Sequence, residues 1–221
     1  LKSILDSVEE RQLVNCEYRV QRRDGEWRWI RDTARLIFDD DGRPLERVGS
    51  WLDHTEAQQL AEQLTHQASH DSLTELPNRR AFEISLQQAL ESAREHGAEH
   101  VLFYLDLDQF KIINDTCGHM AGDALLREVS RILQGWIRRQ DILARLGGDE
   151  FGVLMEHCPL SDAMRVANAL CNAVSDFRFS WENKTFRAGV SIGVVPIDVN
   201  SESCASVLSA ADSACYAAKD A

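Results

Sequence analysis

A pair of glycines between two apolar runs is the feature that most constrains the fold. The segment ARLGGDEFGVLM, residues 144 to 155, places two glycines and two acids at this point. Gly147 and Gly148 predict a tight turn between paired strands, because glycine reaches the positive φ angles that hairpin turns need. Asp149 and Glu150 fit a turn less well, since a strand returning into a core should already be apolar there. We therefore interpret the two carboxylates as functional groups.

The composition is that of a soluble globular protein. The chain has 221 residues, of which 44% are hydrophobic and 27% charged, enough for one large domain or two smaller ones. No apolar run approaches the roughly 18 residues of a membrane span, and no signal sequence opens the chain. Because the chain begins with Leu1, we expect an excerpt. We expect it to be cytoplasmic, or the cytoplasmic part of a membrane-anchored protein.

The cysteines show no metal-ligand or CxxC spacing, which predicts reduced thiols. We expect most of them to be small core residues. They are Cys16, Cys117, Cys158, Cys171, Cys204 and Cys215.

The formal net charge of −12 argues against a nucleic-acid or anionic-lipid partner, because both require a basic surface. It does not exclude one bound nucleotide. A phosphate substrate next to clustered carboxylates would need a divalent cation between them.

The first quarter of the chain has the period-two pattern of strands. Asp24-Gly25 and the DDDGRP segment are hairpin signals, and Trp27, Trp29 and Arg31 alternate with their neighbours. This predicts a three-stranded antiparallel meander. The segment EYRVQRRDGEWRWIRD and the closing Asp53-His54-Thr55 resemble the carboxy-terminal half of a PAS sensory domain, so we assign residues 1–54 to a partial PAS-like sheet. An unrelated meander is the alternative.

Residues 55–70 predict a connecting helix, because Leu60, Leu64 and Ala68 recur at helical spacing without glycine or proline. The helix could form a parallel coiled coil between two protomers or lie on its own domain. The pattern does not separate the two.

The remaining residues, 71–221, alternate helices with hairpins. Pro77 precedes an expected amphipathic helix, Val101–Leu105 is an unbroken apolar run typical of a buried strand, and residues 122–137 predict a second amphipathic helix. After the glycine hairpin we expect a helix over 161–177, strands FRFSW and FRAGVSIGVVPI, and a helix over 206–219. Helices mixed with hairpins predict an α+β fold with helices on the faces of the sheet, rather than a doubly wound parallel one.

The end of the buried strand carries a second pair of acids. Asp106 and Asp108 lie two residues apart, so both point to one face of the strand. The alternative for Asp108 is a cap on the following helix. The turn after it offers backbone N–H groups that can hold phosphate, and Lys111 adds a positive charge.

No Walker A sequence, strand-linked GxGxxG or EF-hand loop is present. The interpretation of a metal site therefore depends on the fold bringing Asp106 to Asp149 and Glu150. Carboxylates with a main-chain carbonyl suit Mg²⁺, or Mn²⁺, with phosphate oxygens completing the shell.

The motifs RLGGDEF, LDLDQFKIINDTCGHMAGD and HDSLTELPNRRAF resemble a diguanylate cyclase domain of the GGDEF family, and the likeness continues to ADSACYAAKDA. The resemblance implies a mixed sheet with flanking helices, like the palm of nucleotidyl cyclases and polymerases. It implies a homodimer in which each protomer binds one GTP, and in which the two GTP become cyclic di-GMP with release of pyrophosphate.

The resemblance also assigns roles to residues. Asp106, the Leu107 carbonyl, Asp149 and Glu150 become metal ligands, the last two also catalytic. The implied substrate-binding residues are Phe110, Lys111, Asn114, His119, Asp123, Leu126, Gly147, Gly148 and Lys219. Asn114 and Asp123 would bind the guanine edge, and His119 and Leu126 would line its pocket. Phe110, Lys111 and Lys219 would hold the phosphates. The alternative for Lys219 is a solvated lysine near a helix end. The family usually has an arginine just after this point that assists phosphate binding; because the given sequence stops at Ala221, we assign no residue to that contact.

Arg138 and Asp141 match the RxxD site at which cyclic di-GMP inhibits its own synthesis in the family. The alternative for Arg138 is a basic residue favoured by a helix carboxyl end. A second arginine often assists in the family, and Arg165 is the one available on the following helix.

Two other functions remain open. The chain could be a silent module that binds GTP or cyclic di-GMP and controls an attached EAL phosphodiesterase. It could also be a metal-dependent phosphatase or nuclease, although the acidic charge offers no path for nucleic acid. The intact acids and Asn114 favour the cyclase.

Overall fold

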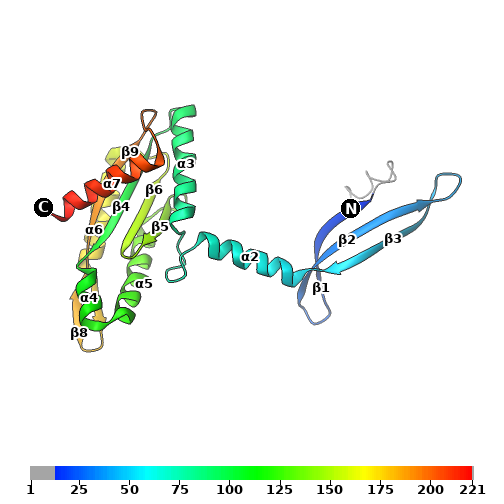
Figure 1. Cartoon of the computed structure of the whole chain (residues 1–221), viewed down its shortest axis with the longest axis horizontal. Helices are drawn as coiled ribbons and strands as arrows, with labels where there is room; N and C mark the ends of the chain where they lie inside the picture. The colour runs from blue at the N-terminus through cyan, green and yellow to red at the C-terminus, as the bar shows by residue number, and fades with distance from the viewer. Residues whose placement is uncertain (1–12, 221) are drawn as a thin grey trace. The chain divides into compact units, whose positions relative to one another are not determined.

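The computed structural model describes residues 13–220, and its contacts divide the chain into two compact units at His66 (Figure 1). In the first unit β1 (Val14–Gln21), β2 (Trp27–Phe38) and β3 (Pro44–Asp53) pair antiparallel in that order. Gly25 and Gly42 have φ of 89° and 77°, as the Asp-Gly turns require. The predicted three-stranded meander is confirmed.

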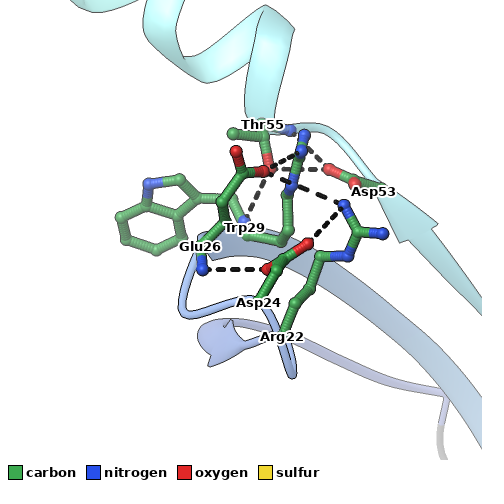
Figure 2. A network of polar contacts seen from close by, with 7 residues as sticks. Arg22, Asp24, Glu26, Trp29, Asp53 and Thr55 are labelled. Atoms are coloured by element: carbon green, nitrogen blue, oxygen red, sulfur yellow. Dashed lines mark hydrogen bonds and ion pairs between the residues drawn. The ribbon is translucent and has the colours of Figure 1, made fainter.

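A network of hydrogen bonds fixes the start of α2 (Thr55–Ser69) on this sheet (Figure 2). The Thr55 hydroxyl donates to Asp53 Oδ1 at 2.6 Å and accepts from the Trp29 N–H at 2.8 Å. The Thr55 N–H donates to the same carboxylate oxygen at 3.0 Å. Two strands and the first turn of the helix are therefore joined through one buried threonine.

The apolar stripe of α2 is uncovered. Leu60 and Leu64 are 56% and 57% exposed. Half-exposed leucines at helical spacing are available to a second helix, and the coiled coil stays a prediction.

A four-stranded antiparallel sheet organises the second unit, in the order β5-β6-β4-β9. Its strands are β4 (His100–Asp108), β5 (Ile142–Gly147), β6 (Glu150–Met155) and β9 (Gly189–Ile197). β4 lies in the middle, which explains its unbroken apolar run: successive side chains enter opposite faces and both faces are buried.

Helices cover both faces of this sheet (Figure 1). On one face α5 (His119–Trp136) and α6 (Leu160–Asp176) pack against Phe103, Leu105 and Phe151. On the other, α3 (Arg79–His96) and α7 (Cys204–Lys219) pack against Leu102 and Leu154. The predicted α+β architecture with flanking helices is confirmed.

One expected strand is broken in two. Residues 186–197 were predicted to be continuous, but β8 (Lys184–Arg187) pairs with β7 (Arg178–Trp181) in a separate hairpin, and β9 joins β4. The aromatic side chains of the hairpin give the reason. Phe179 stacks with Trp181 and packs against Phe186, and together they pack against the core under α5 and α6.

The expectation that most cysteines are small core residues is confirmed in part, because Cys117, Cys171 and Cys204 are partly buried and pack against the two core clusters. All six are free, but only Cys158 and Cys215 are buried. Cys117 ends α4 (Phe110–Cys117), Cys204 begins α7 and Cys16 lies on the three-stranded sheet, and none of these positions is fully enclosed.

No helix within residues 13–220 has the length and apolarity needed to cross a membrane.

Candidate active site

The two acidic segments meet at one end of the four-stranded sheet. Asp106 on β4 lies directly opposite Glu150 on β6 in the strand register. The Leu107 N–H donates to the Asp149 carbonyl at 3.2 Å. The fold thus brings together the four residues to which the sequence assigned metal binding.

The hairpin tip has the backbone that its glycines allow. Gly147 and Gly148 have φ of 153° and 50°, a region that residues with a side chain rarely enter. Arg145 fixes the tip, since its Nε and Nη2 both donate to the Gly148 carbonyl, at 3.0 and 2.8 Å. Nη1 of the same guanidinium binds both oxygens of Asp71, at 2.9 and 3.1 Å.

Two of the carboxylates have a basic partner in this chain. Lys219, at the end of α7, forms an ion pair with Asp106. Arg79, at the start of α3, binds Glu150 through Nη2 at 3.2 Å and donates from Nε to the Leu146 carbonyl at 3.0 Å. Cations from two helices therefore balance the acids of two strands.

Burial and the neighbouring acids shift the pKa values of Asp106 and Tyr104. Burial raises the pKa of Asp106 above its ordinary value, Asp149 and Glu150 raise it further, and Lys219 opposes them. Burial together with a hydrogen bond to Glu150 raises the pKa of Tyr104 to about 12. A cation placed among these acids would relieve their mutual repulsion.

The donor set fits a hard divalent cation in its chemistry. Within the described part of the chain, no three His, Cys, Asp or Glu side chains are arranged as a metal site. Asp106 and Glu150 nevertheless face each other across paired strands, with the Leu107 main chain beside them. Oxygen donors of this kind are those Mg²⁺ takes, and it commonly uses only one or two carboxylates together with substrate phosphates.

Asp108 does not cap the following helix, so that alternative is wrong. The N-cap of α4 is Gln109, in the left-handed conformation with φ 59°, and it makes no side-chain capping bond. Asp108 Oδ1 instead accepts from the Ser191 hydroxyl at 2.8 Å. The carboxylate fits there because Gly189 lies opposite it, where a Cβ would come within 2.6 Å of Asp108 Oδ2.

The Asn114 side chain on α4 lies against α5, with its Oδ1 2.1 Å from the point that a Cβ on Gly122 would occupy. Its Oδ1 is buried and has no hydrogen-bond partner among the described residues. Buried carbonyl oxygens are ordinarily paired, so an acceptor left open in this way is available to a ligand.

The other predicted substrate residues lie on the same two helices. Phe110 packs against the core, Asp123 is half-buried, and Lys111 and His119 are exposed. Leu126 is 1% exposed and belongs to the core. Their roles stay predictions.

The RxxD residues form a tight turn after α5. The Arg138 N–H donates to Asp141 Oδ2 at 3.3 Å, and the Asp141 N–H donates to the Arg138 carbonyl at 3.0 Å. Asp141 is buried, which raises its pKa, and its Oδ1 has no partner within residues 13–220. Both residues line a cavity of about 430 Å³. Arg165, by contrast, pairs with Asp162 at 2.6 Å on an exposed stretch of α6.

Sequence reasoning missed the arginines that hold the site. Arg79 follows the helix cap Asn78, whose Oδ1 accepts from the Ala81 N–H at 3.0 Å. Arg145 lies two residues before the first glycine of the hairpin. Both arginines belong to motifs that resemble the family. Their contacts could not be predicted because their partners, Glu150 for Arg79 and Asp71 for Arg145, are distant in sequence.

The end of the sheet thus gathers acids with basic partners from two helices, and comparison with known proteins identifies the class of domain. The family model described as "Diguanylate cyclase, GGDEF domain" matches residues 68–221, and a "PAS fold" model matches residues 1–50. The chain belongs to the GGDEF family, with a PAS segment before the GGDEF domain.

Two relatives with similar sequences agree with this family assignment. The chain is 44% identical over 180 residues to the probable diguanylate cyclase DgcE of Escherichia coli (strain K12), covering 81% of this chain and 16% of that protein. It is 39% identical over 179 residues to the diguanylate cyclase TpbB of Pseudomonas aeruginosa, covering 79% of this chain and 40% of TpbB. The chain thus spans less than half the length of both relatives.

A solved structure of similar fold is the coiled coil and GGDEF domain of DgcB from Caulobacter crescentus in complex with c-di-GMP. Its TM-score is 0.70 at 31% sequence identity, and the match covers 75% of this chain and 87% of that one.

Proposed function

We propose that this chain is a Mg²⁺-dependent diguanylate cyclase that condenses two GTP into cyclic di-GMP and releases pyrophosphate. The observation that carries the proposal is the register of Asp106 with Glu150 at the sheet end, beside Lys219 and the glycine hairpin. Family membership and the diguanylate cyclase names of DgcE and TpbB support it.

Recognition of the base falls to α4 and α5. The open Oδ1 of Asn114 can accept from a guanine N–H, and the Asp123 carboxylate can accept a second. Adenine presents an acceptor where guanine presents the N1–H donor, so this pair of acceptors would disfavour ATP.

Triphosphate binding falls to the first turn of α4 and to Lys219. Backbone N–H groups at a helix start bind phosphate, and Lys111 lies in that turn. Lys219 already lies within reach of Asp106 and would transfer its contact to a phosphate oxygen when a cation takes the carboxylate.

Asp106, Asp149, Glu150 and the Leu107 carbonyl would hold the cation. When bound, a divalent ion neutralises phosphate charge and lowers the pKa of an attacking hydroxyl. The carboxylate of Asp149 or Glu150 would accept the proton of the 3′-hydroxyl. Arg79 would keep Glu150 aligned while this happens.

Two GTP must meet for each product, so we propose a homodimer in which the PAS-like segment acts through α2. The exposed Leu60 and Leu64 supply an apolar stripe for pairing of two α2 helices. Each protomer would contribute one nucleotide to the reaction.

We propose that the product inhibits at Arg138 and Asp141. A cavity of about 430 Å³ and the open Asp141 Oδ1 support this, and arginine can grip a guanine edge bidentately. Arg138→Ala should raise the inhibitory concentration of cyclic di-GMP at least tenfold; unchanged inhibition would remove this site from the account.

A silent regulatory module is the second candidate. The ion pairs of Asp106 with Lys219 and of Glu150 with Arg79 favour it, because they leave both acids neutralised without a metal. In that case the domain would bind guanine nucleotides and control an attached EAL phosphodiesterase without forming product.

Two substitutions test the cyclase. Glu150→Gln and Asp106→Ala should each reduce cyclic di-GMP formation at least 10³-fold, because each removes a group that holds cation or takes the proton. Product is measured by chromatography after incubation with GTP and Mg²⁺. Glu156→Gln, on the loop after β6, is the control and should keep full turnover. Undiminished synthesis in Glu150→Gln or Asp106→Ala would refute the assignment.

A further inference from the structure

Gly122, in the buried part of α5, lies against the side chain of Asn114. A Cβ at position 122 would lie 2.1 Å from Asn114 Oδ1 and 3.0 Å from its Cγ. A Cβ atom essentially never lies within 3.0 Å of another heavy atom, so one of the two groups would have to move. Phe110 Cζ, at 3.1 Å from the same point, limits the space on the other side.

Glycine at this position is costly for the helix itself. Gly122 lies inside α5 rather than at its end, and glycine is among the poorest helix formers. Gly122 weakens α5 but permits the close approach of the Asn114 side chain to the helix backbone. We infer that this approach is the reason for the glycine.

The group that the glycine admits is an unsatisfied acceptor. Asn114 Oδ1 is buried and no donor within residues 13–220 reaches it. Leaving a buried carbonyl oxygen without a hydrogen bond is unfavourable. A bound ligand that donates a hydrogen bond to Asn114 Oδ1 would remove this cost.

We propose that Gly122 is a specificity-determining positioning residue for the guanine base. By lacking a side chain it lets α4 and α5 approach until the Asn114 amide lies where it accepts from the donor edge of guanine. The next residue on α5 is Asp123, so the same turn of helix sets both acceptors of the base. This inference rests on the proposed function, since it takes a guanine nucleotide as the ligand.

Gly122→Ala in the full chain tests the proposal, and Gly135→Ala is its matched control. Both glycines lie in α5, but a Cβ at 135 would meet no atom within 4 Å. The probes are 3′-deoxy-GTP and 3′-deoxy-ITP, which cannot form product, and binding is measured by calorimetry. ITP lacks the exocyclic amine of guanine.

We expect Gly122→Ala to weaken 3′-deoxy-GTP binding at least tenfold and 3′-deoxy-ITP binding less, so that discrimination between the two falls. Gly135→Ala should bind both as the wild type does. Wild-type affinity and discrimination in Gly122→Ala would overturn the proposal.

A double variant separates positioning from general damage to the helix. In an Asn114→Ala background the clashing atoms are gone, so adding Gly122→Ala should change affinity less than twofold. If Gly122→Ala alone does not fold, the double variant should recover the melting temperature of Asn114→Ala. Equal losses in both backgrounds, or a double variant that stays unfolded, would overturn the proposal.

The same data test the proposed function separately. If the wild type binds neither nucleotide, the proposed function fails and this inference fails with it. If the wild type binds 3′-deoxy-GTP and Asn114→Ala weakens it, while Gly122→Ala does not, the inference alone fails.

Discussion

Each of the register-paired acids at the sheet end is matched by a cation from a different helix. Lys219 reaches Asp106 from α7 and Arg79 reaches Glu150 from α3. In a chain with a net charge of −12, these pairs allow the acids to lie close together before any substrate arrives.

His100 gives a residue-scale prediction about acid sensitivity. His100 begins β4 and is 2% exposed. Burial lowers the pKa of His100 below 6.5, the neighbouring His157 lowers it further, and Glu156 opposes this shift. The unfolded chain takes up a proton near pH 6.5, but the folded chain does so only at lower pH. The contribution to stability is therefore complete above about pH 6.5 and declines as the pH falls toward the folded pKa.

Urea unfolding at pH 7.5 and 5.5 measures this. The loss of unfolding free energy on acidification should be smaller in His100→Asn than in the wild type. His96→Asn, a change of an exposed histidine near the end of α3, should lose as much as the wild type. An equal loss in all three chains would show that His100 is not responsible.

Single residues also show where sequence reasoning stops. The carboxylates could be found because they interrupt apolar strands at Asp106 and Glu150. The cap expected at Asp108 failed because Gly189, eighty-one residues later in the chain, opens a place for that carboxylate against Ser191. Arg79 was not recognised for the same reason: its partner Glu150 is distant in sequence.

At the scale of elements, Arg145 joins the loop before α3 to the glycine hairpin. Its guanidinium binds Asp71 bidentately and holds the Gly148 carbonyl, and its side chain is only 13% exposed. Lysine could not make this set of contacts, because its ammonium is a single point donor rather than a planar fork.

Arg145→Lys should therefore lower the unfolding free energy by about 2 kcal/mol, the range of hydrogen bonds to charged groups, and should reduce turnover more than tenfold by loosening the hairpin tip. Asp71→Asn should act in the same direction. Denaturant unfolding and product chromatography measure the two effects. Arg131→Lys, an exposed pair with Glu128, is the control and should change stability by less than about 0.5 kcal/mol. A tolerated Arg145→Lys would show that the tip is held by its glycines alone.

The elements themselves were largely predictable. Amphipathic spacing found the helices and the Val101–Leu105 run found the central strand, because burial on one or both faces is visible in local periodicity. The break between β8 and β9 was not visible. It depends on Phe179 and Phe186 packing against the core, which is a tertiary contact rather than a local pattern.

At the scale of the whole molecule, two units with different tasks follow one another along the chain. The hydrogen bonds of Thr55 fix the start of α2 to the PAS-like sheet, and the GGDEF domain begins within the last turn of that helix. In the homodimer that we propose, a hydrogen-bonded start and an exposed apolar stripe would suit α2 to couple the PAS-like sheet to the two GGDEF domains.

The most direct test of the central claim is the product balance of the wild-type chain with GTP and Mg²⁺. We predict two pyrophosphate for each cyclic di-GMP, with a rate that rises more steeply than the first power of protein concentration where the dimer dissociates. Release of inorganic phosphate without cyclic di-GMP, or GTP recovered unchanged from a chain that binds it, would contradict the account.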